Sequence, residues 1–383
     1  MKIKVRPEDF IVEEIINLPC CAKGNFTLLR LQKRYWNTLD VIDFVARKLN
    51  VSKNRFSRAG LKDRYSFTTQ YLSFAGDFDQ VIEEKNFTLV PVVKIPKPVS
   101  PAVLEGNRFS LVIRCLTEQE IKKILDNYPQ ISKFGFPNYF DEQRFGSARH
   151  QQGFFAKFLM LGHFRGALKS LLCFPYKEDE KKIKEFKKFC AENWGRWDGC
   201  LKIAPREFKK ILAYLKDNPK DFKNAIKQID PDMLNLYLLA YQSYLFNETL
   251  YLLIKETQNE IVEIPYAYGR FAFYKQPENF DFIKDLKIPM LNEKTDLNGF
   301  CGRLISEVLK KEKIQLRDFK LNKMRFRGVR FKPLSRPAVV LPRDFTIGEP
   351  QDDEIYQGKK KISLNFTLPP GTYATILIKR LII

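Results

Sequence analysis

The chain has 383 residues, of which 44% are hydrophobic, so it can bury sizeable cores and is long enough for two domains. Its 66 Lys and Arg against 45 Asp and Glu give a formal net charge of +21. Such an imbalance indicates a polyanionic partner, first of all nucleic acid, although a generally lysine-rich composition is the alternative. The N-terminal MKIKVRPEDF is charged from the start, so we expect no signal peptide.

Several function classes lack their sequence signatures in this chain. The seven cysteines are odd in number and show no C-x-x-C spacing, which favours free thiols in a reducing cytoplasm; they are Cys20, Cys21, Cys115, Cys173, Cys190, Cys200 and Cys301. His150 and His163 are the two histidines, and neither has a second histidine at ligand spacing, which argues against zinc. The sequence contains no G-x-G-x-x-G, G-x-x-x-x-G-K or G-x-S-x-G motif, so dinucleotide binding, P-loop chemistry and serine hydrolysis are disfavoured.

The first part of the chain combines predicted strands with two helices. Strands are predicted at 10–16, 26–33, 68–74 and 109–115. A helix is predicted from Thr38, which can cap it, because apolar residues recur at i, i+3, i+7 and i+10. A second helix is expected at 118–127, and the proline-rich stretch 91–101 is predicted to be a connector.

The stretch 57–70, SRAGLKDRYSFTTQ, places one carboxylate among cations. Asp63 lies between Lys62 and Arg64, with Arg55 and Arg58 just upstream. Nearby cations favour the charged form of a carboxylate, so we expect Asp63 to be ionised. An ionised Asp in a basic setting suits a covalent catalyst that acts on a polyanion, whereas the alternative is a solvated turn with mixed charges.

A second unusual stretch, GFPNYFDEQRFG at 135–146, interleaves aromatic residues with amides and an arginine. Three Phe and one Tyr alternate with Asn138, Gln143 and Arg144 between two glycines. This combination suits stacking on a base while its edge is read, and the alternative is an aromatic loop packed in the core.

After Gly153 the sequence becomes mainly helical. Helices are predicted at 163–172, 179–191, 206–217 and 233–254, and the last is apolar on nearly all sides but too polar to span a bilayer. Residues 303–336 carry twelve Lys or Arg against three Asp or Glu, with three Phe among them, which favours phosphate contacts. Strands are predicted again at 343–347, 362–368 and 373–382, so 151–336 reads as an insertion into a sheet domain.

Four blocks of the sequence together resemble the TruD family of tRNA pseudouridine synthases. They are KVRPEDFIVEE at 4–14, AGLKDRYSFTTQ at 59–70, NYFDEQRFG at 138–146 and PGTYATILIKR at 370–380. The resemblance implies an α+β pseudouridine synthase fold with a mixed, mainly antiparallel sheet. It also implies a catalytic domain at 1–150 and 337–383, and an inserted α/β TRUD domain at 151–336.

The resemblance also implies the reaction, the isomerisation of a uridine in tRNA to pseudouridine without a metal or organic cofactor. In bacterial members the target is position 13 in the D-arm. Asp63 matches the catalytic aspartate of the family, and Lys4 matches a basic residue that pairs with it. The insertion departs from the family in being lysine-rich with little motif of its own, so its tRNA contacts stay open.

The substrate-binding residues are likewise carried over from the resemblance. Phe140 matches an aromatic residue that stacks on the target base, and Asn138 matches a polar neighbour that holds the nucleoside. Arg144 and Gln143 lie inside the same motif and are given a supporting role in substrate binding.

Two other functions are weighed against this one. A non-catalytic RNA-binding protein would have no use for Asp63, because a carboxylate weakens the field of phosphate-binding cations. A metal-dependent nuclease would need clustered carboxylates or histidines, and the loop at 57–70 offers one Asp. We therefore expect a cytoplasmic tRNA-modifying enzyme, with tRNA as its partner and no membrane or small-molecule cofactor. We expect a monomer, since no apolar interface helix stands out.

Overall fold

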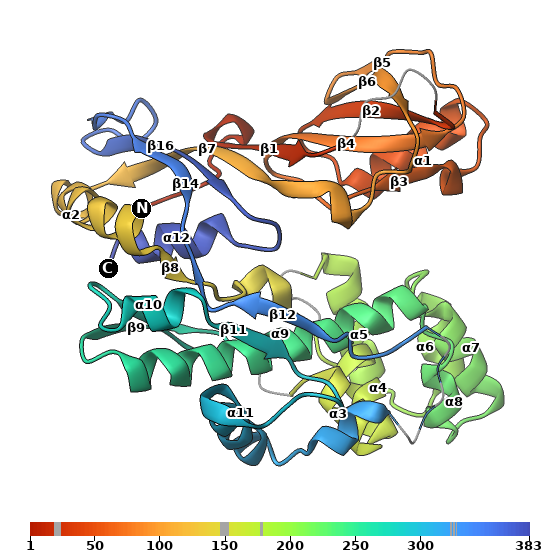
Figure 1. The fold of residues 1–383 in the computed structure, drawn as a ribbon. Helices are drawn as coiled ribbons and strands as arrows, with labels where there is room; N and C mark the ends of the chain where they lie inside the picture. Colours follow the sequence, from red (N-terminus) through yellow and green to blue (C-terminus); the bar gives the residue numbers. More distant parts are fainter. Residues whose placement is uncertain (19–23, 146–152, 177–178, 322–323, 325, 327) are drawn as a thin grey trace. The chain divides into compact units, whose positions relative to one another are not determined.

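The computed structural model describes residues 1–18, 24–145, 153–176, 179–321, 324, 326 and 328–383 (Figure 1). Cys20, Cys21, Gly146 and His150 lie outside these residues. The chain forms two compact units. Unit 1 comprises Met1–Phe136 and Val340–Ile383, and unit 2 comprises Pro137–Val339. The assignment of 151–336 as an inserted TRUD domain stays a prediction.

Unit 1 is built on one mixed sheet, in which ten strands of the described residues take part. The strand order is β14-β16-β7-β1-β4-β2-β6-β5, with β15 beside β16 and β3 beside β4. The strands are β1 (Phe10–Ile16), β2 (Phe26–Lys33), β3 (Phe56–Arg58), β4 (Phe67–Ala75), β5 (Ile82–Glu84), β6 (Phe87–Ile95), β7 (Leu104–Leu116), β14 (Arg343–Ile347), β15 (Gln351–Asp352) and β16 (Lys360–Leu368). The pair β1–β4 is parallel and the other pairs are antiparallel, so the predicted α+β fold with a mixed, mainly antiparallel sheet is confirmed.

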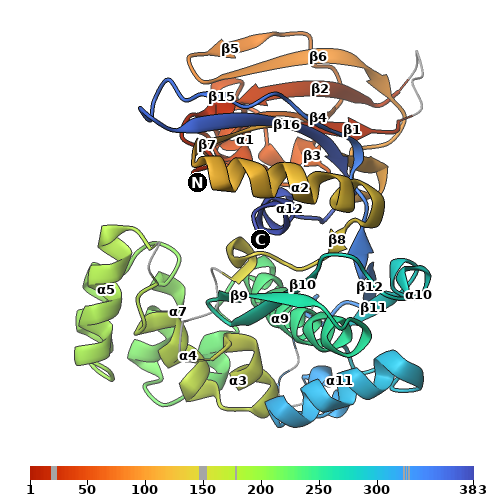
Figure 2. The same cartoon turned by 90° about the vertical axis from the view of Figure 1, so that its left-hand side faces the viewer.

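Helices cover the sheet of unit 1. The helical elements are η1 (Pro7–Asp9), α1 (Thr38–Lys48), η2 (Lys53–Arg55), η3 (Pro101–Val103), α2 (Glu118–Phe134) and α12 (Ala374–Leu381). The apolar stripe of α1 packs on Leu29 and Leu31 of β2 and Leu72 of β4. A capping box between Thr117 and Glu120 begins α2, which lies beside α12 (Figure 2).

Two predictions for unit 1 are wrong. The stretch 373–382 was predicted as a strand, but it contains the helix α12, which buries Ile376, Leu377 and Leu381 on one side. A short apolar run does not distinguish a helix from a strand by its periodicity. Pro91 belongs to strand β6 and not to a connector. It pairs with Leu29 next to a register shift in β2, where a residue without an N–H is tolerated.

Unit 2 is mainly helical. Its helices are η4 (Glu142–Phe145), α3 (Phe155–Leu161), α4 (Phe164–Leu172), α5 (Lys181–Glu192), α6 (Trp197–Ile203), α7 (Lys209–Asp217), α8 (Phe222–Ile226), α9 (Pro231–Thr257), α10 (Phe280–Lys284), α11 (Gly299–Glu312) and η5 (Leu316–Lys320). Its strand pairs are β9 (Ile261–Tyr266) with β10 (Gly269–Tyr274), and β11 (Lys287–Met290) with β12 (Leu334–Pro337). The short strands β8 (Phe136–Pro137) and β13 (Val339–Val340) contain the two points where the chain passes between the units. The long helix α9 is buried on most sides, as predicted.

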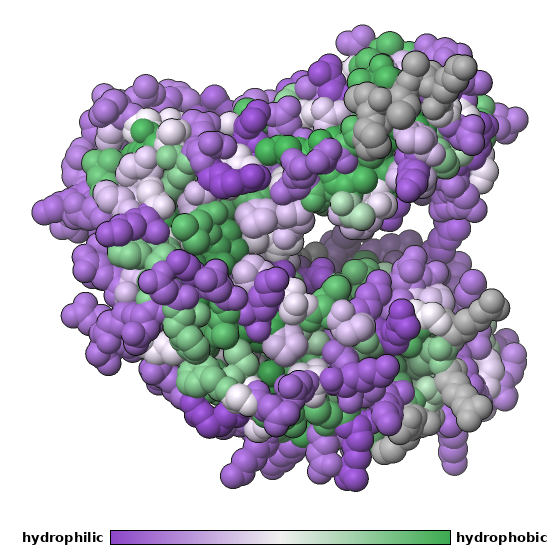
Figure 3. Space-filling model, in the orientation of Figure 1, coloured by the Kyte–Doolittle hydropathy of each residue, from purple (hydrophilic) through white to green (hydrophobic). Residues whose placement is uncertain are grey.

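The surface is largely polar. Figure 3 shows hydrophilic residues over most of the visible face of each unit, with apolar residues exposed in separate patches. In the part of the chain that the structure describes, no helix has the length and apolarity that a membrane span requires.

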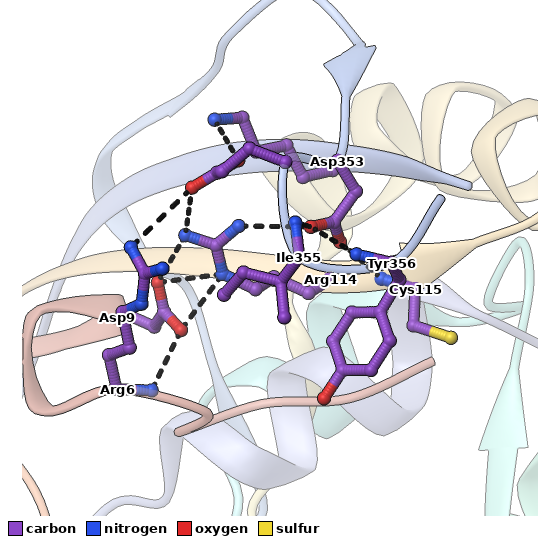
Figure 4. A network of polar contacts seen from close by, with 9 residues as sticks. Arg6, Asp9, Arg114, Cys115, Asp353, Ile355 and Tyr356 are labelled. Atoms are coloured by element: carbon purple, nitrogen blue, oxygen red, sulfur yellow. Dashed lines mark hydrogen bonds and ion pairs between the residues drawn. The ribbon is translucent and has the colours of Figure 1, made fainter. Parts of the chain in front are cut away.

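A buried ionic network fixes the turn that leads into β1 (Figure 4). The guanidinium of Arg114 on β7 donates to both carboxylate oxygens of Asp9 at 2.9 Å and to Asp353 Oδ1 at 3.2 Å. Asp353 also accepts backbone N–H groups of Cys115 and Ile355, each at 2.9 Å. The network ties η1 to β7 and to the residues after β15, and so fixes the N-terminal segment that precedes β1.

We expect Arg114→Met to lower the free energy of unfolding by about 3–5 kcal/mol, because two buried carboxylates would lose their cation. Urea unfolding at neutral pH measures the change. Arg108→Met on the same strand is the control, because the Arg108 side chain is 59% exposed and pairs with Glu13 at 3.5 Å. The control should change stability by less than about 1 kcal/mol. Equally small effects of both substitutions would contradict a structural role for the network.

Candidate active site

Lys4 and Asp63 meet because of the parallel pairing of β1 with β4. Ile11 of β1 is opposite Phe67 of β4, so the segments that precede the two strands emerge at the same edge of the sheet. Lys4 lies in the first of these segments and Asp63 in the loop 59–66 between β3 and β4. The Lys4 ammonium donates a hydrogen bond to Asp63 Oδ2 and lies 4.3 Å from the centre of the Phe10 ring.

The Asp63 carboxylate is partly buried and charged. Its side chain is 31% exposed, and Oδ1 accepts the backbone N–H of Tyr65 at 3.1 Å. Burial alone would raise the pKa of Asp63, but the hydrogen bond and charge of Lys4, with the Tyr65 N–H and the charge of Lys33, hold it below its ordinary value of 3.8. The group is therefore an accessible carboxylate that is ionised at neutral pH.

Lys33 is a residue of this site that sequence reasoning missed. Lys33 is the last residue of β2 and lies opposite Thr68 of β4. It is buried, with an exposed fraction of 1%. Its ammonium donates to the backbone oxygens of Asp63 at 2.9 Å and Lys62 at 3.3 Å. Burial lowers the pKa of Lys33 to about 8, the charge of Asp63 opposes this, and the charge of Lys62 adds to it. The signal in the sequence was a lysine at an inward-facing position of an alternating strand.

The cations next to Asp63 in the sequence have other partners. Lys62 forms an ion pair with buried Glu14 at 2.8 Å and donates to Asn107 at 2.7 Å, while Arg55 donates to the backbone oxygen of Ala75. The expectation that neighbouring cations in the sequence keep Asp63 ionised is therefore corrected, since Lys4 and Lys33 do so.

Thr38 also has a role other than the predicted one. Asn37 is the N-cap of α1, and Thr38 Oγ1 accepts the backbone N–H of Lys62 at 3.3 Å. The same hydroxyl donates to Gln70 Oε1 at 2.7 Å. The start of α1 thus anchors the loop that carries Asp63.

The other predicted site residues, Phe140, Asn138, Arg144 and Gln143, lie in unit 2. Phe140 is 4% exposed, and its backbone N–H and oxygen bond Asn247 of α9, each at 2.9 Å. Its ring meets the guanidinium of Arg336 at 3.7 Å and the ring of Phe246 edge-on at 5.4 Å. The face of Phe140 is thus a stacking surface for a flat group, which Arg336 occupies in this structure.

Asn138 belongs to the same cluster. Its side chain accepts a hydrogen bond from Arg336 at 2.9 Å and donates to the backbone oxygen of Pro337 at 2.9 Å. The Arg144 guanidinium lies 5.7 Å from the Phe140 ring, and Gln143 is exposed. Arg336 and Asn247, distant in the sequence from this motif, were missed by the sequence analysis.

The basic segment 303–336 differs from its prediction in one respect. Phe319 and Phe331 are each 2% exposed and pack edge-on at 4.9 Å, so these aromatic residues belong to the core. Lys310, Lys313 and Arg317 line an open groove of about 790 Å³ together with Asp318. The three cations can therefore contact an anion, whereas the rings of Phe319 and Phe331 are not accessible for stacking.

No metal centre is visible in the described ranges, where no group of three or more His, Cys, Asp or Glu side chains is arranged to hold a metal ion. The five described cysteines carry free thiols, as predicted for them; they are Cys115, Cys173, Cys190, Cys200 and Cys301.

Comparisons with known proteins identify relatives over the whole chain. Residues 1–381 match the family model of tRNA pseudouridine synthase D (TruD). A protein of Methanococcus maripaludis named "Probable tRNA pseudouridine synthase D 1" is 36% identical over 99% of this chain and 99% of its own length. The tRNA pseudouridine synthase D of Leptospira interrogans is 31% identical over 100% of this chain and 96% of its own length.

A solved structure supports the fold. A crystal structure from Methanosarcina mazei that carries the TruD name superposes with a TM-score of 0.72. It covers 99% of this chain and 93% of its own chain at 24% sequence identity. The likeness confirms the predicted fold class.

The pKa of Lys33 predicts a pH dependence of stability. Between about pH 8 and pH 10.5, the ordinary pKa of a lysine, Lys33 binds fewer protons in the folded chain than in the unfolded chain. The stability contribution of Lys33 is therefore complete above pH 10.5 and is lost as the pH falls toward 8. The wild-type chain should therefore gain stability from Lys33 as the pH rises from 7 to 10.5, and Lys33→Met should not. We expect the free energy of unfolding of Lys33→Met, relative to that of wild type, to be lower at pH 10.5 than at pH 7 by on the order of 3 kcal/mol.

Urea titrations at four pH values in this range measure the difference. Lys53→Met is the control, because its side chain is 65% exposed and pairs with Asp43 at 3.4 Å. It should change stability by less than about 1 kcal/mol at each pH. A Lys33→Met difference that is independent of pH would show that Lys33 titrates normally.

Proposed function

The chain belongs to the TruD family of tRNA pseudouridine synthases, and we propose that Asp63 is the catalytic carboxylate of its isomerisation of uridine to pseudouridine. The observation that carries this proposal is the hydrogen bond of Lys4 to an accessible Asp63 whose pKa is lowered. A non-catalytic RNA-binding protein is not favoured, because the relatives that match over the full length are named synthases.

The reaction needs an ionised carboxylate at every step in which Asp63 could take part. The N1–C1′ bond of the nucleotide breaks, the uracil turns, and C5 bonds to C1′ while the C5 proton leaves and N1 gains one. Asp63 can attack the base at C6, attack the sugar at C1′ or remove the 2′ proton, and each role requires a free lone pair. Lys4 keeps that lone pair free of a proton.

We propose that the cluster around Phe140 binds the target nucleoside. The base must leave its stack, at a cost of a few kcal/mol, and stacking on an aromatic ring offsets about 1–3 kcal/mol of this. The flat guanidinium of Arg336 lies 3.7 Å from the Phe140 ring, which supports the use of this ring for stacking. Binding of the base at the same face would require Arg336 to move aside. Asn138 would hold the nucleoside, with Arg144 and Gln143 in support.

The finer features of the function are proposed on the same basis. The target would be uridine 13 in the D-arm, as in bacterial members of the family. The groove at Lys310, Lys313 and Arg317 would contact phosphates of the tRNA, since these cations are open to an anion. The enzyme would act as a monomer in the cytoplasm, without a metal or organic cofactor.

We expect Asp63→Asn to lose at least about a hundredfold in turnover, because the amide can neither attack nor accept the proton. Unmodified tRNA that carries 5-tritiated uridine gives the assay, since bond formation at C5 releases the tritium. Asp77→Asn is the matched control, because Asp77 is an aspartate of unit 1 whose side chain is 81% exposed. It should keep the wild-type rate.

Filter binding of the same tRNA should give nearly equal affinities for wild type and Asp63→Asn. Mapping of the product in the tRNA tests position 13 separately. Appreciable tritium release by purified Asp63→Asn would refute the role of Asp63, and release from another uridine would refute only the position.

A further inference from the structure

Tyr35, which contacts the loop that carries Asp63, and Tyr65, which lies in that loop, have exposed side chains. Tyr35 is 46% exposed and Tyr65 is 59% exposed, and they are the two most exposed aromatic residues among the described residues of unit 1. Trp36, the neighbour of Tyr35, instead packs edge-on against Phe44 and Phe87. The chain therefore buries the adjacent indole and leaves the tyrosine outside.

Both tyrosines are tied to the catalytic loop. The backbone N–H of Tyr65 donates to Asp63 Oδ1 at 3.1 Å. Arg64 Nε donates to the backbone oxygen of Tyr35 at 3.1 Å, and the Arg64 guanidinium lies 5.7 Å from the centre of the Tyr65 ring. Arg64, the residue that follows Asp63, thus connects the backbone of Tyr35 to the ring of Tyr65.

The backbone at Tyr35 adds a second, independent observation. Tyr35 has a φ of +59°, a left-handed conformation that is an outlier for a bulky residue. Lys4, the partner of Asp63, has a φ of +57°. Such strain costs free energy and is concentrated at functional sites, where the surrounding structure enforces it. Here the hydrogen bond from Arg64 is one of the contacts that hold Tyr35 in place.

We propose that Tyr35, Arg64 and Tyr65 form a stacking subsite for the nucleobases next to the target uridine. This inference rests on the proposed function of Asp63. Exposed aromatic rings beside an arginine are the side chains on which unstacked RNA bases lie. The backbone N–H of Tyr65 donates a hydrogen bond to the Asp63 carboxylate, and on this proposal a base stacked on the Tyr65 ring would be a neighbour of the reacting uridine.

The charge of the surface favours RNA over a protein segment. Arg64 is exposed and the chain carries a net charge of +21, so a polyanion is attracted to the loop. A flipped uridine leaves its two neighbours without a stacking partner on one side. The tyrosines would replace that partner and hold the strand open at the reacting nucleotide.

The test combines protein variants with altered RNA. After the modified uridine is mapped, the tritium-release assay is run on the intact tRNA and on two transcripts, each abasic at one neighbour of the target. The enzymes are wild type, Tyr35→Ala, Tyr65→Ala and Tyr65→Phe, with Leu125→Ala as the control. Leu125 is an exposed apolar residue of α2, also in unit 1. Truncation of exposed side chains should leave folding intact, which thermal unfolding verifies.

We expect each alanine variant to lower kcat/KM on intact tRNA by about 5- to 150-fold, the range of one lost base stack. On the transcript that lacks the stacked base, the same variant should differ little from wild type. Tyr65→Phe should retain most of the activity, because the ring is kept, and Leu125→Ala should match wild type.

Equal losses on the intact and on both abasic transcripts would overturn the subsite, because the tyrosines would then act only through Asp63. Wild-type kinetics of both alanine variants on all three RNAs would overturn it as well. Absence of tritium release by the wild-type enzyme would instead refute the proposed function, so the two failures are distinguishable.

Discussion

The ion pair of Lys4 with Asp63 depends on one topological feature, the single parallel strand pair in a mainly antiparallel sheet. The parallel register of β1 and β4 brings two segments that are distant in sequence to the same edge. The antiparallel neighbour β2 ends at that edge and adds Lys33. Lys33 is the last residue of its strand, and Lys4 and Asp63 lie in the segments that precede theirs. The pairing of the strands therefore determines which cations lie near the Asp63 carboxylate.

The loop that carries Asp63 is held mostly by polar groups, and several of them are buried. Lys33 and Thr38 bond its backbone, while Lys62 reaches inward to Glu14 on β1. Buried polar groups are costly unless they are paired, so each of these bonds restricts the loop to one conformation. The lowered pKa of Lys33 shows that the burial of its charge is not fully compensated. This is a cost in stability at the place where the carboxylate must be fixed.

The sequence predicted strands β1, β2, β4, β7, β14 and β16 and helices α1 and α2 of unit 1, because their apolar periodicity is regular. It did not predict the strands β3, β5, β6 and β15. The strand prediction at 373–382 was wrong, because a short apolar run fits both the helical and the strand period. The segment forms α12, whose buried residues include Ile376, Leu377 and Leu381. Asp63 and Lys4 were predicted as site residues through motif resemblance, and their catalytic role stays a proposal. Lys33 and Arg336 could not be found in this way, because their roles arise from strand register and from contacts between distant segments.

Lys4 keeps a partly buried Asp63 ionised. The most direct measurement is an NMR titration of the ¹³C-labelled aspartate carboxyl groups, with the Asp63 signal assigned by its loss in Asp63→Asn. We expect a pKa of Asp63 below 3.8 in the wild-type chain and a higher pKa in Lys4→Met, where the effect of burial is opposed by fewer charges. A wild-type pKa at or above 3.8, or a pKa that does not change in Lys4→Met, would contradict it.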